Sequence, residues 1–179
     1  MDFNDSPVLE QIPETITTDC AGLNWEQVSS LSPHPPQDAN LAADGWLWFN
    51  NVAVNHEEGS LLLGFDNQPL RGQQLLVVAL DVHWRYGFSF STAIRSPLGK
   101  NMPTPEGWRF PGLARYGMVI YQVTGPDSLR AWQIHSDRVD SPQEICLNPQ
   151  ERIFVNINDQ RGSYSDNSGS FDLLVKVMA

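Results

Sequence analysis

Basic residues are scarce in this sequence. Eleven Lys and Arg stand against 21 Asp and Glu, which gives a formal net charge of −10. Nucleic-acid phosphates and anionic lipid surfaces attract Lys and Arg, so this charge balance argues against both as main partners. We therefore expect no nucleic acid among the partners and no membrane insertion.

Long apolar runs are also absent from the sequence. No stretch of eighteen apolar residues occurs, and a transmembrane helix needs about that length. Residues 1–14, MDFNDSPVLEQIPE, contain acidic residues and no basic region ahead of an apolar stretch, so no secretory signal is expected. Cytoplasmic localisation is the expected default, with signal-independent export left open.

Cysteine occurs only at Cys20 and Cys146. Neither residue has a CxxC neighbour, so the pair is not a metal-binding motif. Two buried thiols are one interpretation of the pair, and a disulfide joining the N-terminal segment to the main body is the other. The lack of a secretory signal argues against the disulfide.

The chain is rich in turn formers and in short apolar segments. Thirteen Gly and thirteen Pro are spread along it, and hydrophobic residues make up 41%, enough for a proper core. Strands are predicted at 45–55, 61–65, 73–90, 117–125, 129–136, 151–159 and 170–178. Short strands joined by turns predict an all-β fold, an antiparallel β-sandwich or jelly roll.

The predicted strands begin only at about residue 45. Residues 1–45 are therefore expected to form an extension, partly loop over 29–40, that packs on a β-sandwich domain spanning 46–179. Within 73–90, alternate residues from Leu76 to Trp84 are predicted to share one face. The same alternation from Phe171 to Val177 marks one face of the last strand.

The segment INDQRGSYSDNSGSF, residues 157–171, separates the two clearest strands and is longer than a tight hairpin needs. Asp159, Asp166 and Asn167 supply side-chain oxygens of the kind that Ca²⁺ prefers, and Gly162 allows a sharp bend. The spacing is not that of an EF-hand, and the segment has no Cys or His for softer metals. A polar loop held by Asx-turns, without an ion, is the alternative.

The order of these residues resembles the calcium-binding loop of the bacterial galactophilic lectins, a calcium-dependent galactose-binding family. The matching residues are Asn158, Asp159, Gly162, Tyr164, Asn167, Ser168, Gly169, Ser170 and Phe171. Ser163 stands where the family has Thr, and Asp166 where it has Asn. Upstream, VAVNHEEG (52–59) and LVVALDVHWRYG (76–87) resemble two further segments of the family, so the resemblance covers about 52–179.

The resemblance implies a galactose-binding-domain-like fold and a bound Ca²⁺. The implied calcium ligands are the side chains of Asp159, Asp166 and Asn167 and the backbone carbonyls of Tyr86 and Ser163. The implied sugar contacts in the loop are Asp159, Gln160, Ser163 and Asp166. The family also holds the sugar with a His and a Gln, but the corresponding loop here, 96–112, contains no His. Arg95, Asn101 and Trp108 are the substitutes available in or beside that loop.

No catalytic constellation is evident. The four His lack metal-ligand spacing, and the nucleophile-elbow motif G-x-S-x-G is absent. Trp84 and Trp132 are predicted to be core residues, whereas Trp108 is predicted either to stack on a sugar or to plug the space under its loop.

The expected function is calcium-dependent carbohydrate binding of the lectin type. We expect the protein to have no enzymatic activity. The first alternative is a calcium-stabilised β-sandwich interaction module with a protein partner and no sugar. An enzyme or effector on the same fold ranks last. Galactose-type carbohydrate is the expected partner, and homo-oligomerisation is left open.

Overall fold

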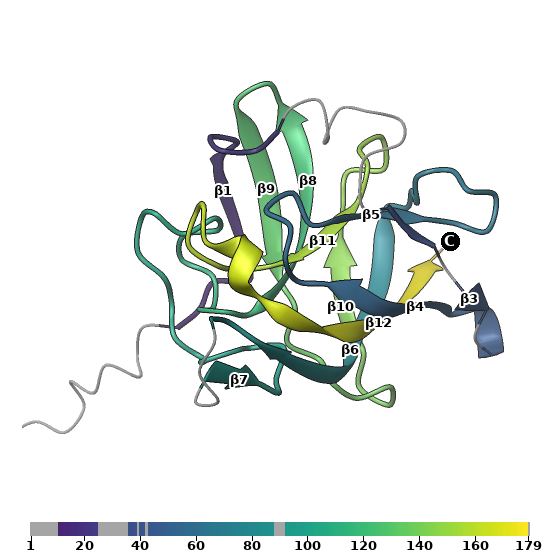
Figure 1. The fold of residues 1–179 in the computed structure, drawn as a ribbon. Coiled ribbons are helices and arrows are strands. Elements are labelled where there is room, and N and C mark those ends of the chain that lie inside the picture. Colours follow the sequence, from purple (N-terminus) through teal and green to yellow (C-terminus); the bar gives the residue numbers. More distant parts are fainter. Residues whose placement is uncertain (1–10, 25–35, 39, 42, 88–91, 179) are drawn as a thin grey trace, which may run out of the picture.

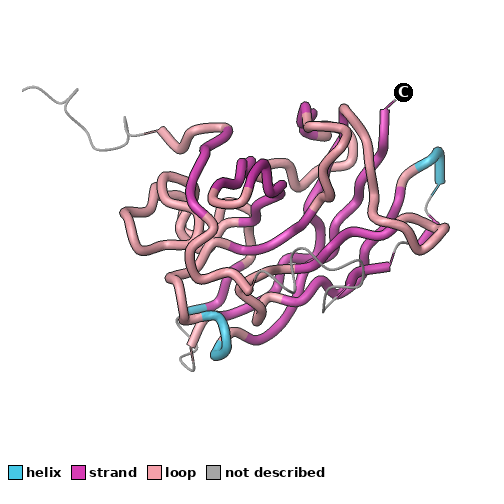
Figure 2. The backbone as a smooth tube through the Cα atoms, turned by 90° about the horizontal axis from the view of Figure 1, so that it is seen from above, coloured by secondary structure: helices cyan, strands magenta, loops and turns pink. Residues whose placement is uncertain are grey.

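The strands form two facing sheets, as the expected fold class requires. In the computed structural model, which describes residues 11–24, 36–38, 40–41, 43–87 and 92–178, Figure 1 shows the strands in two layers. The two named helical elements are the short 3₁₀ segments Ala43–Gly45 and Tyr164–Asp166, coloured cyan in Figure 2. The protein is an antiparallel β-sandwich, and no described helix is long and apolar enough to cross a membrane.

Each sheet is built from strands distant in sequence. The first has the order β1 (Thr15–Asp19), β9 (Ser128–Gln133), β8 (Met118–Gly125), β11 (Phe154–Ile157), β5 (Ser60–Leu63) and β2 (Pro36–Asp38). The second has the order β10 (Gln143–Cys146), β6 (Gln74–Arg85), β12 (Ser168–Met178), β4 (Leu47–Ala53) and β3 (Asn40–Leu41), with β7 (Ala93–Ile94) paired to β6. Only the short β2–β5 pair is parallel among the described strand pairs.

The seven predicted strands all occur, as β4, β5, β6, β8, β9, β11 and β12. The turn between β8 and β9 makes them a hairpin. The loop predicted over 29–40 lies outside the described residues, apart from 36–38 and 40, which pair as parts of β2 and β3.

The main core lies between the two sheets and includes Trp84, Trp132, Phe171 and Leu173. The predicted face of β6 was wrong in its first half, because Leu75, Val77 and Ala79 point into this core rather than Leu76, Val78 and Leu80. The alternation is interrupted at Asp81, which has a positive φ of 50°, and opposite it the β6–β12 register shifts between Ser170 and Asp172. Such a bulge exchanges the two faces of a strand, so Val82 and Trp84 are again core residues.

A second apolar cluster covers the other face of the first sheet. Phe110, from the long 96–112 loop, and Leu113, just after it, pack there against Tyr121 and Phe154. Ile12 and Ile16 from the N-terminal segment pack against the same cluster. The long loop is therefore fixed over the first sheet by buried apolar side chains.

Part of the expected N-terminal extension belongs to the sheets themselves. Thr15–Asp19 forms the edge strand β1, paired antiparallel with Ser128–Trp132 of β9. Cys20, just beyond this strand, is a free half-buried thiol, and Cys146 is free and exposed. The disulfide alternative is therefore wrong, and only Cys20 is close to the buried-thiol interpretation.

Candidate functional site

The segment between β11 and β12 is a compact loop with a defined backbone. Gly162 adopts φ of 82°, the left-handed conformation that glycine reaches without a steric penalty. The Ser163 amide donates to the Gln160 carbonyl at 3.0 Å, and a 3₁₀ turn, Tyr164–Asp166, follows. The chain thus reverses so that Asn167 returns to the side of Asp159.

Asn158 anchors the start of this loop to the long loop that precedes β8. Its side chain is fully buried, and its Oδ1 accepts the Phe110 amide at 3.0 Å. Its Nδ2 lies within hydrogen-bond distance of four oxygens, on Thr104, Phe110, Leu113 and Ala114. These hydrogen bonds fix residues 104–114 beside the loop at 158–167, which we call the candidate loop.

Asp159 and Asn167 form the buried centre of the loop. They are 3% and 6% exposed, and Asn167 Nδ2 donates to Asp159 Oδ2 at 3.0 Å and to the Val54 carbonyl at 2.9 Å. Both partners are acceptors, so the amide orientation is set and Oδ1 must point elsewhere. This Oδ1 is buried and has no hydrogen-bond partner. A buried acceptor left without a partner is uncommon in proteins and calls for an explanation.

Burial makes the Asp159 carboxylate costly to ionise. Its pKa is raised from 3.8 to about 6, chiefly by desolvation, and further by the negative charges of Asp166 and Glu57. Hydrogen bonds from Asn167 and from the Gln160 amide, at 2.7 Å to Oδ1, partly offset this effect. A cation beside these carboxylates would lower the cost of their ionisation.

Asp166 lies on the exposed side of the same centre. Its Oδ2 is 3.9 Å from where a Cβ on Gly87 would lie, so the end of β6 reaches the candidate loop. No described residue donates a hydrogen bond to the Asp166 carboxylate or to the backbone carbonyls of Tyr86 and Ser163. Among the described residues, the unpartnered oxygens here are therefore those of Asp166, the Asn167 Oδ1 and these two carbonyls.

Glu57, from the turn before β5, binds the backbone of the candidate loop. Its Oε1 accepts the Gly162 amide at 2.6 Å, and its Oε2 is 3.5 Å from Nη1 of Arg109. The Arg109 side chain is completely buried, and its guanidinium also donates to the carbonyls of Asp19 and Ala21. Neither Glu57 nor Arg109 was singled out from the sequence, because the residues they join lie more than thirty positions apart.

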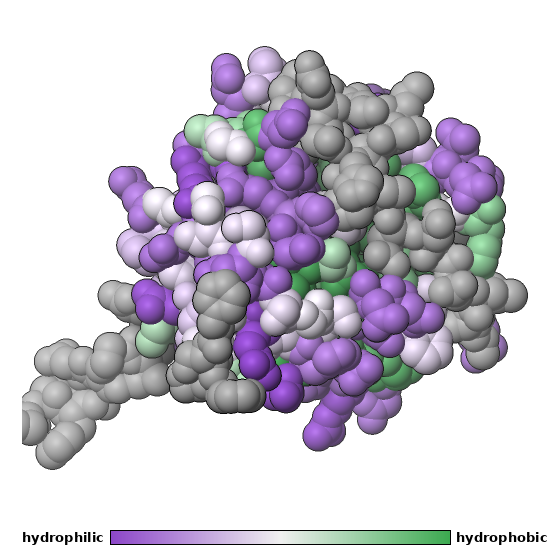
Figure 3. All heavy atoms as spheres, in the orientation of Figure 1, coloured by the Kyte–Doolittle hydropathy of each residue, from purple (hydrophilic) through white to green (hydrophobic). Residues whose placement is uncertain are grey.

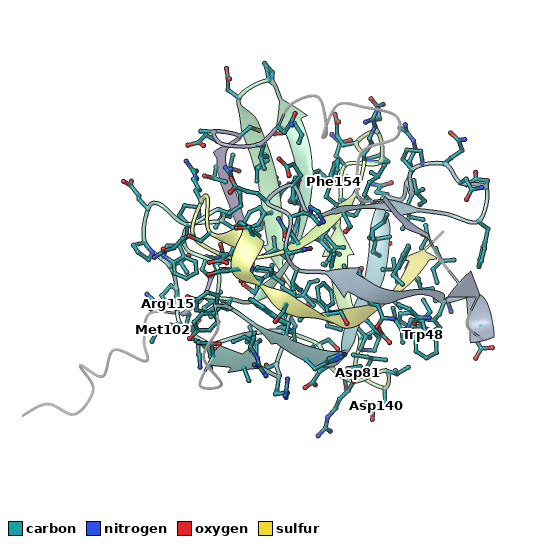
Figure 4. All side chains as sticks on the ribbon, viewed as in Figure 1. Trp48, Asp81, Met102, Arg115, Asp140 and Phe154 are labelled. Atoms are coloured by element: carbon teal, nitrogen blue, oxygen red, sulfur yellow. The ribbon has the colours of Figure 1, made fainter. Side chains whose placement is uncertain are left out.

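Arg95, Asn101 and Trp108, the expected substitutes for the family's His and Gln, do not lie together at the candidate loop. Trp108 is 4% exposed and pairs through its backbone with Gln160, so it plugs the space under the loop. Asn101 instead lines a separate cleft of about 790 Å³, together with Met102 and the N-terminal residues Gln11–Glu14. In Figure 4, Met102 lies beside Arg115, whose amide donates to the Met102 carbonyl at 2.8 Å. Arg95 lines another hollow, with His83 and Arg85.

Tyr116, two residues before β8, lies beside the candidate loop. No feature of the sequence predicted this position. Its ring stacks on Tyr86 with centroids 3.6 Å apart, and its amide donates to the Asn158 carbonyl at 2.9 Å. Burial raises the pKa of Tyr116 to about 12, and the charges of Asp159 and Asp166 contribute to the shift. Its hydroxyl therefore lies in the field of the same two carboxylates.

The chemistry of these groups fits a hard cation. Among the described residues, no three His, Cys, Asp or Glu side chains gather in a way that could hold a metal. Calcium, however, accepts amide and backbone carbonyl oxygens beside carboxylates, and the unpartnered Oδ1 of Asn167 is such an oxygen. The donor set consists of oxygens only, which excludes the softer metals that prefer thiolate or imidazole.

Comparison with known proteins adds no further identification. Searches against protein-family models, curated proteins and solved structures find no significant match to this chain.

Proposed function

We propose that this protein binds carbohydrate through a calcium ion held by the loop at 158–167. The observation that carries the proposal is the buried, unpartnered Oδ1 of Asn167 beside the buried carboxylate of Asp159. An ion there would satisfy the orphaned acceptor and neutralise the carboxylates. The lectin-like order of residues in the loop agrees with the same assignment.

Five residues would hold the ion. Asp159, Asp166 and Asn167 would contribute side-chain oxygens, and Tyr86 and Ser163 would contribute backbone carbonyls. When bound, calcium supplies open coordination positions that two vicinal sugar hydroxyls can fill. Asp159, Gln160, Ser163 and Asp166 would accept or donate the hydrogen bonds that orient these hydroxyls. Galactose-type sugars are the first candidates, and no reaction is catalysed.

Thermal unfolding and glycan binding test the two parts of this proposal separately. Calcium should raise the Tm and a chelator should lower it, because the ion binds only the folded loop. Asp159→Ala should abolish the calcium-dependent rise. Asp140→Ala is the matched control, since Asp140 is exposed and belongs to the segment between β9 and β10 rather than to the candidate loop. A Tm indifferent to calcium and chelator would refute the ion site.

A glycan array then tests the ligand. The proposal predicts binding that disappears in chelator and returns with added calcium. Hydrophilic residues make up much of the described part of the face shown in Figure 3, a surface compatible with a polar ligand. Calcium-dependent stability without binding to any arrayed glycan would contradict the carbohydrate part of the proposal.

One observation favours a second candidate, a calcium-stabilised interaction module for a protein partner. The 96–112 loop offers neither an exposed Trp108 nor an Asn101 at the candidate site, so fewer side chains are available to grip a sugar. In this case the ion would only stiffen the loop. The array distinguishes the two candidates, because only the lectin binds glycans.

A further inference from the structure

Tyr116 adopts a backbone conformation that is unusual for a bulky side chain. Its φ is 58°, in the left-handed region that aromatic residues rarely occupy. Such a conformation is strained and persists only where the surroundings enforce it. Here the Tyr116 amide donates to Asn158 and the Gly117 amide donates to the Ala114 carbonyl, which holds the turn.

The strained turn places the Tyr116 ring in a fixed position beside the loop. The ring lies parallel to Tyr86 at an interplanar angle of 8°, and the edge-on rings of Trp84 and Trp108 are 6.0 and 5.0 Å away. Three aromatic neighbours leave the ring little freedom to turn. A side chain fixed in this way loses little conformational entropy when it contacts a ligand.

The hydroxyl of this fixed ring is free to donate. It makes no hydrogen bond to any residue that the structure describes, although the ring itself is half-buried. A phenol hydroxyl without a partner is available to donate a hydrogen bond to a bound ligand.

We infer that Tyr116 contacts the sugar directly and determines specificity, its hydroxyl donating a hydrogen bond to a hydroxyl or ring oxygen of a neutral saccharide. This inference rests on the proposed function. The two carboxylates accept hydrogen bonds from sugar hydroxyls, and Tyr116 supplies a neutral donor. A neutral saccharide is the matching chemical class, because it supplies both vicinal hydroxyls for the ion and an oxygen that accepts from the phenol.

Tyr116→Phe tests the inference, because it removes the hydroxyl and keeps the ring, its stacking and the backbone strain. The variant should bind galactose, or the best glycan of the array, about three- to tenfold more weakly in calcium, the usual effect of one neutral hydrogen bond. Its calcium affinity and its Tm without sugar should match those of the wild type. Addition of the sugar should also shift the Tyr116 ring signals in the NMR spectrum of the wild-type protein.

Tyr121→Phe is the matched control for the same chemical change. The Tyr121 hydroxyl is buried and donates to the Glu58 carbonyl, away from the candidate loop. This control should lower the Tm and leave sugar affinity unchanged. Wild-type affinity in Tyr116→Phe, together with ring signals unmoved by sugar, would overturn the role of Tyr116 while leaving the lectin proposal standing. A wild-type protein that binds calcium and no glycan would overturn both.

Discussion

The Glu57 carboxylate lies 3.5 Å from the Arg109 guanidinium, which is completely buried. The other oxygen of the same carboxylate accepts the Gly162 amide. One side chain thus joins a buried positive charge to the backbone of the candidate loop. Because Arg109 also binds carbonyls of the N-terminal segment, three distant parts of the chain meet at this ion pair.

Arg109→Met should destabilise the whole protein. Removing one partner of a buried pair leaves Oε2 of Glu57 without its positive partner and the carbonyls of Asp19 and Ala21 without the guanidinium donor, which costs about 3–5 kcal/mol. Urea unfolding followed by tryptophan fluorescence measures this free energy. Arg161→Met is the control, because its guanidinium pairs with the exposed Asp19 carboxylate, and exposed pairs contribute about 1 kcal/mol or less. Equal losses in both variants would contradict the structural role of Arg109.

The stability of the calcium-free protein should fall as pH rises through the range that Asp159 titrates. Its folded pKa, about 6, is above the ordinary value of 3.8, so the folded state binds more protons than the unfolded state between these values. Protonation therefore favours folding below about pH 4, and this stabilisation is lost as pH rises towards 6. Tm measured from pH 4 to 7 in chelator shows the effect, and Asp159→Asn should flatten that part of the profile. A wild-type profile as flat as the variant's would contradict the raised pKa.

Asp166→Asn should weaken calcium binding and leave the fold intact. The change keeps an oxygen in place and removes one negative charge, so calcium affinity should fall by about tenfold. It should also bring the pKa of Asp159 down, because the charge of Asp166 contributes to its rise. Isothermal calorimetry with calcium measures the affinity, and Asp140→Asn provides the matched control. Unchanged affinity would place the ion elsewhere.

Gly169→Ala should destabilise the second sheet by about 2–4 kcal/mol, through backbone strain and a steric clash. Gly169 has φ of 98°, and a Cβ there would lie 2.6 Å from Cα of Trp84. Gly125→Ala is the control, because its nearest contact would be Ser128 Oγ at 3.9 Å. Chemical denaturation of both variants without calcium checks the difference. A cost in Gly169→Ala as small as in Gly125→Ala would contradict the clash.

The sequence could predict the central strands because their apolar residues alternate. It could not predict β1 or β10, whose short and mostly polar segments are held by pairing with β9 and β6 rather than by their own pattern. The bulge at Asp81 also escaped prediction, since it depends on the register of β6 against β12. The all-β sandwich was confirmed, whereas the jelly-roll connectivity stays a prediction.

The candidate loop stood out by its length and its oxygen-bearing residues. The residues that support it, Glu57, Arg109 and Tyr116, come from other segments and carry no local signal. Their roles arise only when the fold brings these segments together. Gly169, part of the lectin-like motif, is required by close strand packing whether or not an ion is bound.

The edge strand β1 has a consequence for association between molecules. It satisfies the outer hydrogen-bonding groups of β9 along Ser128–Trp132. A chain trimmed past Asp19 would leave these groups open as a template for another copy, the usual origin of edge-to-edge aggregation. The N-terminal segment therefore covers the β9 edge with a short, mostly polar strand, which is a poorer template for further strands.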